Sequence, residues 1–519
     1  MESVKETKDI IAAKQNNMSQ EEPKKCKGWR KYHRWGGIIC CVFMLVFCFS
    51  GIILNHRSTY SGVDVPRWFM PPAYHIENYN NGTIRGTLGL GGDSVLGFGN
   101  CGVWLTDKGF NRLADFNNGF PEGVDNRNIR NIVRTREGIL WCATQSGLYR
   151  HHDGKWLETA LPGNTERLSD VCLTPDSNGV VAVTRTRFFV QDGDGGFKSL
   201  RLGEPDIDIS EVSLFKTIWN LHSGQLFGLP GKIIVDLLAI ILAFLSMGGI
   251  LIFILPYPIR ARTRKHLKAT RKIRVFRWNV KWHNSVGYVT LPLTLLIVLT
   301  GMCLRPPLMV PFVLNSTKPL PASTMDTGDK WHDRLRALRF DADSDTWLLS
   351  TSEGFFRLDS LNGRPRIIPK DKVPPVSPMG ITVFEHTAPD KWLIGSFSGL
   401  FRWNPSTGQS RDYFTDEIFD SSEAGGFILS DHLVSGYSHD LNENTVFDYA
   451  EGSDSKLPES ELLRSQPMSL WNFALELHVG RCYDPFLGPL SSMFVFISGV
   501  AILLVLVSGY IIHRRMKRR

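Results

Sequence analysis

The sequence lacks the cysteine patterns of several common sites. Nine cysteines are spread along 519 residues without a C-x-x-C pair, which argues against a zinc ribbon or a redox dithiol. The absence of C-x-x-C-H also excludes a covalently attached c-type haem. One disulfide remains open among the four cysteines expected in the outer polar parts of the chain, at Cys101, Cys142, Cys172 and Cys482.

The sequence also lacks a glycine-rich nucleotide-binding fingerprint at the start of a helix. The clusters at Gly89–Gly92 and Gly97–Gly99 lie in a region rich in β-forming residues and open no expected helix. We also expect no cleavable signal peptide in residues 1–30, because they are polar and the apolar run that follows has no obvious small-residue cleavage site.

Four apolar runs interrupt an otherwise polar chain. Each is about 20 residues long, which is enough to cross the hydrocarbon core of a bilayer as a helix. We therefore predict four membrane-spanning helices and two large polar segments between them. The runs are Gly36–Asn55, Ile233–Leu255, Val286–Leu304 and Leu490–Ile512.

Acidic residues are absent from three tracts that flank these runs. The tracts hold 21 of the 59 basic residues, while the net charge of the chain is only +8, so the rest of the chain is net acidic. The positive-inside rule places the tracts in the cytoplasm and the polar segments outside. Anionic lipid explains the tracts, and we expect no nucleic acid partner. The tracts are Lys24–Arg34, Arg260–Lys281 and Arg514–Arg519.

The predicted fold class is an integral membrane protein with a four-helix bundle built from two tandem repeats, plus an all-β, propeller-like extracytoplasmic region. Both termini are expected in the cytoplasm, and the β segments on the opposite side of the membrane. In chain order the expected parts are a cytoplasmic tail (1–30), helix 1 (31–56), a β segment (57–215), an interfacial helix with helix 2 (216–256), a basic loop (257–282), helix 3 (283–305), a second β segment (306–470), an interfacial helix with helix 4 (471–513) and a basic tail (514–519).

Histidines recur at matched places in the two halves. His33 and His283 each stand in the pattern K-[YW]-H-x-x-x-G at the cytoplasmic end of a membrane run. His222 and His478 each precede a membrane run and are followed two residues later by glycine. A single such histidine fits an interfacial residue at headgroup depth. Because the pattern occurs twice, we predict two pairs of facing imidazoles, as in a b-type haem site.

The two polar segments share a recurring phrase: a short strand with Trp, a small polar pair, then Gly and a strand ending in Arg. Each copy predicts a β-hairpin, and spacings near 40 residues are typical of propeller blades. We expect three or four blades in each half, closing into one ring of seven or eight; two separate β domains are the alternative. The phrase resembles propeller repeats in the sensor domains of bacterial two-component regulators. Its copies run over 102–112, 138–150, 346–357 and 391–402.

The pattern K-[YW]-H-x-x-x-G followed later by [ST]-G, together with L-H-x-G ahead of a helix that ends S-G-Y-x-x-x-R-R, resembles the PepSY-associated transmembrane family. These iron-regulated inner-membrane proteins include ferric-siderophore reductases. The resemblance implies a four-helix core with two b haems, ligated at the positions of His33, His283, His222 and His478. The outer segments depart from the family, which usually carries PepSY modules there.

The resulting functional hypothesis is a haem-dependent electron-transfer protein that reduces a periplasmic ferric complex for iron acquisition. The expected cofactor is haem b, two per chain. The electron donor would be separate, a quinol or a flavoprotein reductase, because the cytoplasmic loop of about 25 residues is too short for a domain. The alternative is a non-enzymatic, membrane-anchored propeller that binds a ligand or partner protein.

Overall fold

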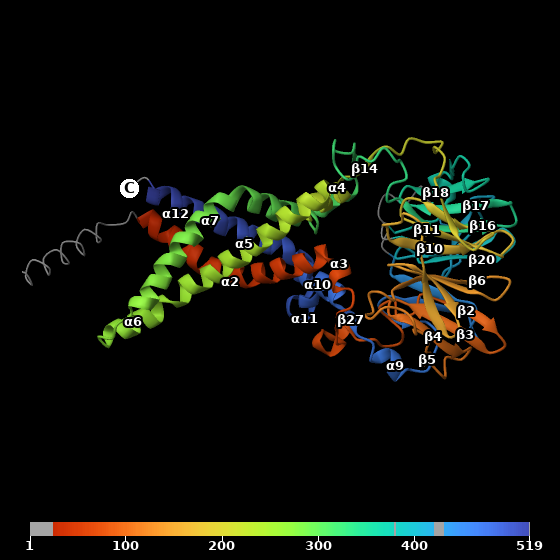
Figure 1. The fold of residues 1–519 in the computed structure, drawn as a ribbon, viewed down its shortest axis with the longest axis horizontal. Helices are drawn as coiled ribbons and strands as arrows, with labels where there is room; N and C mark the ends of the chain where they lie inside the picture. The colour runs from red at the N-terminus through yellow and green to blue at the C-terminus, as the bar shows by residue number, and fades with distance from the viewer. Residues whose placement is uncertain (1–23, 378–379, 420–429, 518–519) are drawn as a thin grey trace, which may run out of the picture. The chain divides into compact units, whose positions relative to one another are not determined.

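A computed structural model describes residues 24–377, 380–419 and 430–517, and Figure 1 labels their helices and strands. The chain divides into two compact units, each assembled from distant parts of the sequence. The helical unit contains the chain up to Asn55, Ser213–Ser316 and the chain from Ala474 on. The β unit contains His56–Val212 and Thr317–Phe473.

Four helical stretches are long and apolar enough to cross a membrane, as predicted. They are Gly28–Asn55, Gln225–Arg264, Thr270–Cys303 and Arg481–Arg515. The elements of this unit are α2 Lys24–Asn55, α4 Leu214–His222, η3 Gln225–Phe227, α5 Gly228–Ile254, α6 Pro256–Arg264, α7 Thr270–Cys303, α8 Met309–Val313, α10 Leu470–Val479, η5 Arg481–Tyr483, α11 Asp484–Leu487, η6 Gly488–Met493 and α12 Phe494–Lys517.

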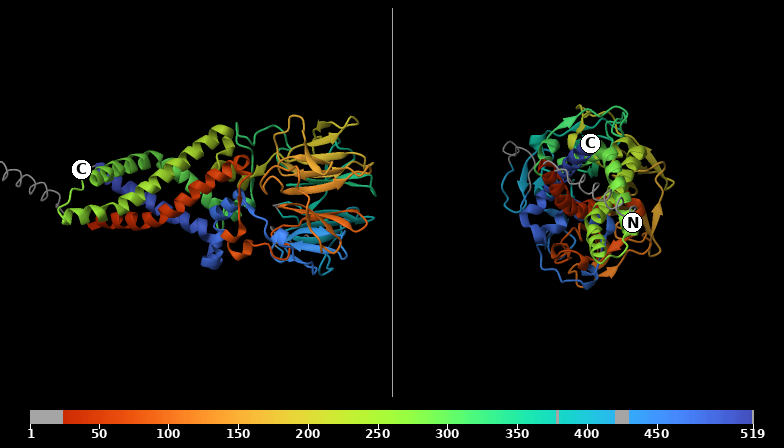
Figure 2. Two further views of the ribbon diagram at one scale, coloured as in Figure 1. Left: turned by 60° about the horizontal axis from the view of Figure 1, so that its bottom comes forward. Right: turned by 90° about the vertical axis from the view of Figure 1, so that its left-hand side faces the viewer.

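The four long helices form a closed bundle. α2 contacts α5 and α12, and α7 contacts the same two helices, so α2 and α7 lie on opposite corners (Figure 2). Large apolar side chains such as Ile240, Val289 and Leu504 are exposed on the outer faces of the helices. In a bilayer these faces would contact lipid, which explains why apolar residues surround the helices instead of forming one buried stripe.

The β unit consists of antiparallel meanders. Groups β6–β9, β10–β13, β16–β19 and β20–β23 each form a four-stranded sheet, while β2–β5 and β24–β26 join through the parallel pairing of β2 with β24. The strands are β1 Asp64–Val65, β2 Gly86–Gly91, β3 Ser94–Gly99, β4 Gly102–Asp107, β5 Ala114–Asp115, β6 Ile129–Arg134, β7 Leu140–Thr144, β8 Leu148–His152, β9 Lys155–Thr159, β10 Leu168–Leu173, β11 Val180–Thr184, β12 Phe188–Gln191, β13 Phe197–Leu200, β14 Val212–Ser213, β15 Ser316–Thr317, β16 Leu335–Asp341, β17 Thr346–Thr351, β18 Gly354–Leu358, β19 Arg366–Ile367, β20 Val383–Ala388, β21 Lys391–Ser396, β22 Gly399–Trp403, β23 Ser410–Asp412, β24 Val434–Ser438, β25 Thr445–Asp448, β26 Gly452–Ser453 and β27 Met468–Ser469. Its short helices are α3 Arg57–Tyr60, η1 Arg67–Phe69, η2 Pro72–Tyr74, η4 Lys370–Lys372 and α9 Glu461–Arg464.

A buried apolar cluster lies between each group of strands and the next. One cluster, for example, joins Val181 and Phe188 of the third group to Leu338 and Trp347 of the fourth. The last cluster joins Phe447 of the sixth group to Trp104 of the first, so the packing returns to its start. The described strands thus form six groups in a closed cycle, fewer than the seven or eight expected from a spacing near 40 residues.

The recurring Trp phrase forms hairpins, as predicted, in β7–β8, β17–β18 and β21–β22. Its small polar residue closes the turn: the hydroxyl of Thr144 accepts hydrogen bonds from the backbone N–H of Ser146 and Gly147. Sequence reasoning missed a further copy at Thr184, whose hydroxyl accepts from the N–H of Arg187, because arginine replaces the expected glycine there.

Disulfides do not stabilise these elements. Cys101, Cys142 and Cys172 of the β unit are buried free thiols, and so is Cys482 of the helical unit. The one outer pairing left open by the sequence is therefore absent among these four residues.

A buried ion pair joins the two sequence segments of the β unit. Asp170 on β10 is 3% exposed and forms a salt bridge with Arg339 on β16. The same carboxylate accepts from the backbone N–H of Leu338 and of Val171. Arg339 in turn donates to the carbonyl of Phe384 on β20, so three neighbouring groups depend on one carboxylate.

We predict that Asp170→Ala destabilises the β unit by about 3–5 kcal/mol, because it leaves a half-buried guanidinium and a buried backbone N–H without an acceptor. The measurement is urea or thermal unfolding of the full chain in detergent, followed by the fluorescence of the buried tryptophans. Asp194→Ala, which removes an exposed carboxylate of the same unit, is the control and should leave the transition in place. Equal effects of the two variants would contradict this role of Asp170.

Candidate functional site

The structure brings His33 and His283 together in the helical unit. His33 lies on α2 and His283 on α7, the two opposite helices of the bundle. Their ring centres are 6.4 Å apart and the ring planes are inclined by 73°. The two imidazoles therefore face each other across the bundle, as the sequence predicted.

His222 and His478 form a second pair in the same unit. They lie near the ends of the short helices α4 and α10, which precede α5 and α12. Their ring centres are 6.3 Å apart and their planes are inclined by 66°. The two pairs have nearly the same separation although their residues come from four different helices.

Three of these four histidines are oriented by contacts between Nδ1 and a neighbouring helix. Nδ1 of His33 lies 3.1 Å from the carbonyl oxygen of Val505 and 3.1 Å from the hydroxyl of Ser508. Nδ1 of His222 lies 3.1 Å from the carbonyl of Ile297 and 3.1 Å from the hydroxyl of Thr300.

Nδ1 of His478 lies 2.8 Å from the hydroxyl of Ser50. A carbonyl oxygen can only accept, so Nδ1 carries the proton wherever it contacts one, and Nε2 is left with its lone pair. Among the described residues, Nε2 of His33, His222 and His478 makes no hydrogen bond.

A glycine follows each of these hydroxyl residues and lets the imidazole approach the helix. A Cβ added at Gly301 would come within 2.9 Å of Cε1 of His222, and one at Gly509 within 3.0 Å of Cε1 of His33. At Gly51 the distance to Cε1 of His478 would be 3.6 Å. The [ST]-G ends of three helices therefore serve as platforms for the rings.

His283 departs from this pattern. Its platform on α5 is Gly248-Gly249, so no hydroxyl is available at the matching position. The side chain of Asn279, 2% exposed, occupies the space instead and donates to the carbonyl of Gly248 at 2.7 Å. Nδ1 of His283 is buried and has no partner at normal hydrogen-bond geometry among the described residues.

The geometry of both pairs fits a metal held between two imidazoles. A metal ion about 2.0 Å from one nitrogen of each ring, with each nitrogen about 1 Å from its ring centre, places the ring centres about 6 Å apart. The observed 6.4 and 6.3 Å agree with this value. An Nδ1–H donated to a carbonyl is also the usual support of a ligating histidine. The chain offers two ligands at each place, which suits the axial positions of haem iron better than a zinc site closed by three or four residues.

The glycines one turn after the first histidine pair do not provide close helix packing. A Cβ at Gly37 would meet no atom within 4 Å, and one at Gly287 would only touch Leu245 at 3.9 Å. A small residue at Gly37 and Gly287 is therefore not required by helix packing in the described part of the chain.

Burial keeps the second pair neutral. Loss of hydration lowers the pKa of His222 to about 4, although the carbonyl of Ile297 opposes the shift. Loss of hydration lowers the pKa of His478 to about 3, and the neighbouring His222 adds to the effect. Neutral imidazole is the form that binds a metal.

The β unit contains another group of potential metal ligands that sequence reasoning missed. Asp341, Asp343 and His386 offer ligand atoms within 4.8 Å of one another. Nε2 of His386 lies 2.8 Å from the carboxylate of Asp343, which also accepts from the backbone N–H of Asp390. The signal in the sequence was the D-x-D-x-D run at 341–345. Asp343 and His386 already satisfy each other, so this group requires no ion.

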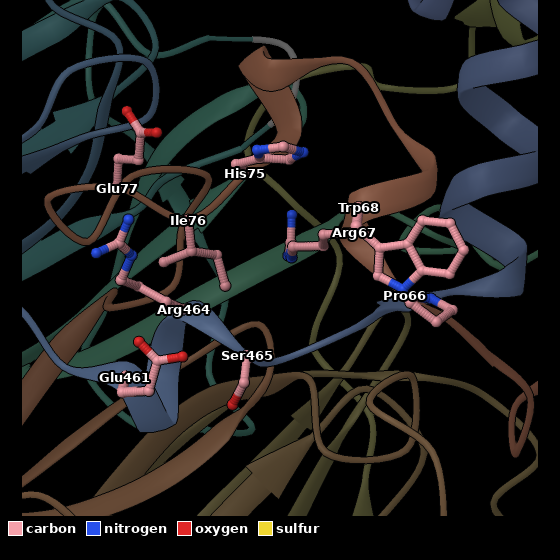
Figure 3. Close-up of a pocket in the computed structure, with 9 residues that line it drawn as sticks. All are labelled: Pro66, Arg67, Trp68, His75, Ile76, Glu77, Glu461, Arg464 and Ser465. Carbon is pink, nitrogen blue, oxygen red and sulfur yellow. The ribbon is translucent and has the colours of Figure 1, made fainter.

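A cavity of about 380 Å³ lies on the β unit beside η1 and α9 (Figure 3). Its buried Arg67 donates to the carbonyls of Tyr74 and Gln466 and so holds loops together. The exposed Trp68 stands at its edge. The guanidinium of Arg67 is thus engaged in holding these loops together.

Comparison with known protein families identifies the family of this chain. The family model of the PepSY-associated TM region matches residues 11–255 and again residues 253–516. The chain therefore belongs to this family. It is a member with four candidate membrane helices and a large β-rich unit. No curated protein matches the chain.

Solved structures resemble the chain only weakly. The extracellular domain of a protein described as a hybrid two-component system from B. thetaiotaomicron shares 11% identity at a TM-score of 0.33, over 71% of this chain and 32% of that one. The extracellular domain of one described as a one-component system from the same organism gives 10% and 0.31, over 76% and 42%. Dihydro-heme d1 dehydrogenase NirN gives 9% and 0.27, over 75% and 57%. The chain thus covers less than two thirds of each of these structures, and scores this low do not establish a common fold.

The lowered pKa values predict that the protein loses stability in acid. Since the folded-state pKa values of His222 and His478 lie below the ordinary 6.5, the unfolded chain binds more protons, and stability falls from pH 6.5 down to about 3–4. We expect the melting temperature in detergent to fall over this range, and to fall less in the double variant His222→Leu/His478→Leu. His266→Asn, at an exposed histidine, is the control. An unchanged pH profile in the double variant would contradict the assignment.

Proposed function

We propose that the two histidine pairs hold two b haems and that the protein passes electrons across a membrane. The observation that carries the proposal is the pair of matching ring separations, 6.4 and 6.3 Å, with Nδ1 of three rings hydrogen-bonded to the protein. His33 with His283 would supply the axial ligands of one haem, and His222 with His478 those of the other. Haem bound in this way supplies one-electron transfer.

The residues of the bundle support such a role by orientation and exclusion of water. Carbonyls and hydroxyls of α2, α7 and α12 hold three rings in one tautomer, and glycines let the rings lie against the helices. Two imidazoles per metal leave no open position for a substrate, which favours electron transfer over chemistry at the metal itself.

We propose a location in the bacterial inner membrane, with both termini and the basic loop in the cytoplasm and the β segments in the periplasm. The support is the charge pattern: one basic tract lies at the start of α2, one runs from α6 into α7, and one lies at the end of α12. The donor would be a quinol or a flavoprotein reductase, and the acceptor a periplasmic ferric complex that gains one electron per iron.

We propose that the helical unit arose from two tandem repeats and that the β unit is a propeller of six blades. Repeat symmetry is supported by the two matches of the family model and by equivalent contacts, since His222 lies on Thr300-Gly301 as His478 lies on Ser50-Gly51. The cycle of six strand groups with an apolar cluster between each two supports the propeller. The alternative function, a non-enzymatic membrane-anchored propeller, does not explain why four histidines lie in two pairs with matching separations.

The first experiment measures haem content and the reduced-minus-oxidised visible spectrum of the purified protein. We expect b-type bands and two haems per chain. His33→Ala and His222→Ala should each lose one haem, and the double variant His33→Ala/His222→Ala should lose both. His33→Ala/His283→Ala should still retain one, because both residues belong to the same pair.

His266→Ala, at an exposed histidine of the loop between α6 and α7, is the control and should keep two haems. A protein that remains colourless when haem is supplied during expression would end the electron-transfer proposal. Variants of one pair that lose both haems together would contradict the assignment of the pairs.

We predict that removing the hydroxyl group beside a histidine changes the redox potential of the haem proposed at that histidine. Ser508→Ala should raise the midpoint potential of the site of His33, and Thr300→Val that of the site of His222, each by about 20–40 mV. An acceptor at Nδ1 makes the imidazole a stronger donor to the oxidised metal, and its loss is worth about 0.5–1 kcal/mol. Potentiometric titration measures both sites in one sample, so the unaltered site is the control. Equal shifts of both sites would refute the local effect.

A further inference from the structure

Arginines gather on the first strands of neighbouring groups in the β unit. Arg85 directly precedes β2, Arg130 is the second residue of β6, Arg167 directly precedes β10, and Arg336 is the second residue of β16. These strands belong to the first four groups of the cycle, and β6, β10 and β16 are neighbours in it. Similar positions in adjacent sheets therefore carry the same side chain.

A β-bulge places two of these arginines. Pairing shifts register between Ile129 and Asn131 in β6, which leaves Arg130 as the extra residue. The same shift between Leu335 and Ala337 in β16 leaves Arg336 as the extra residue. A bulge turns its extra side chain away from the regular alternation of the strand and is common beside binding sites.

The equivalent bulges in two other groups carry serine. Ser169 in β10 donates to the carbonyls of Val183 and Thr184, and Ser435 in β24 donates to the carbonyl of Phe447. A short hydroxyl that bonds to its own sheet suffices for this bulge. Arginine is therefore not required by the fold at Arg130 and Arg336.

The hydrogen bonds of these arginines go to neutral acceptors. Arg85 donates to the side-chain oxygen of Asn128 and the carbonyl of Ile129. Arg130 donates to the amide oxygen of Gln145 at 2.9 Å, and Arg336 donates to the carbonyls of Asp333 and Leu335. A guanidinium has five N–H donors, so each keeps donors for another partner.

Positive charge exceeds negative charge around this cluster. The nearby carboxylates are already paired: Asp125 with Arg57, Asp333 with Arg185, and Glu353 with Arg334. In the described part of the chain, no carboxylate lies within ion-pair distance of Arg85, Arg130, Arg167 or Arg336. Seven guanidinium groups thus stand against three carboxylates.

The guanidinium groups are close enough to repel one another. Loss of hydration, with repulsion from Arg85, Arg57, Arg185 and Arg167, lowers the pKa of Arg130 to about 9. Loss of hydration, with repulsion from Arg185 and Arg334, lowers the pKa of Arg336 to about 10, although Asp333 and Glu353 oppose the shift. Arg130 and Arg167 are nevertheless exposed to solvent, so a small solute can reach them. Uncompensated like charges cost stability and are typical of a site that awaits a ligand of opposite sign.

We propose that Arg85, Arg130, Arg167 and Arg336 bind a small multivalent oxyanion, and that in this protein the oxyanion is the carboxylate-bearing ligand shell of the ferric complex. The second part rests on the proposed function; the first part does not. Guanidinium groups bind carboxylates through paired N–H···O hydrogen bonds, which suits a polycarboxylate chelate better than a neutral one.

The test is calorimetric titration of the full haem-loaded chain in detergent, at low ionic strength, with citrate and with ferric citrate as probes. We expect both probes to bind, and Arg130→Gln and Arg336→Gln each to weaken binding at least about ten-fold, the effect of losing one charge-assisted contact. Arg150→Gln removes the same charge from an exposed position on β8 and should change the affinity by less than about two-fold.

The two probes distinguish the sources of the anion. Binding of both shows that the site recognises the carboxylates themselves, and binding of ferric citrate alone shows that it recognises the assembled complex. Binding of neither, or equal weakening by Arg150→Gln, overturns the proposal. A neutral ferric hydroxamate complex should not compete with citrate.

A melting experiment gives a second readout that does not depend on redox activity. Arg130→Gln should raise the melting temperature without ligand, since it removes repulsion, and should abolish the stabilisation that citrate confers on the unaltered protein. Citrate should bind His33→Ala and His222→Ala as it binds the unaltered chain. Failure of the haem proposal therefore leaves this result unaffected, whereas a lower melting temperature of Arg130→Gln would show that the arginine is structural.

Discussion

The helical unit depends on one local arrangement, an imidazole lying on a glycine of a neighbouring helix. Gly301 and Gly509 remove the Cβ that would crowd His222 and His33, and a Cβ at Gly51 would be in ordinary van der Waals contact with His478. The preceding Ser or Thr, with a carbonyl one turn earlier, directs Nδ1 toward the helix in the clearest cases. Nε2 of these rings makes no hydrogen bond among the described residues.

The fourth contact shows which part of the arrangement is essential. At His283 the platform has lost its hydroxyl, and Asn279 fills the position from the same helix as the histidine. The ring separation of its pair nevertheless equals that of the other pair to within 0.1 Å. The glycine and the ring distance are thus preserved where the hydrogen bond is not, and this agrees with a role in holding a shared ligand. Different support for the four rings would also let the two sites differ in potential.

The β unit meets a different constraint, the closure of its strand groups into a cycle. Sheet edges left open would invite pairing with other chains, and the parallel contact of β2 with β24 joins the first and last groups. Asp170 and Arg339 connect the two sequence segments that build the cycle. The clustered arginines Arg85, Arg130, Arg167 and Arg336, in contrast, form no salt bridge like that of Asp170 with Arg339 in the described part of the chain. Their excess charge is a cost to the fold that a bound anion would offset.

Much of this protein could be predicted from its sequence, because hydropathy, charge and repeated short patterns are local properties of the chain. They predicted the four apolar helices, the hairpins at three of the four Trp phrases and the matched positions of His33, His283, His222 and His478. The tertiary structure alone decided at what distance the paired rings lie and against which helix each ring packs. It also decided that six groups close the cycle and that Arg85, Arg130, Arg167 and Arg336 lie on neighbouring strands. These are contacts between residues far apart in the chain, and no short pattern records the packing that brings them together.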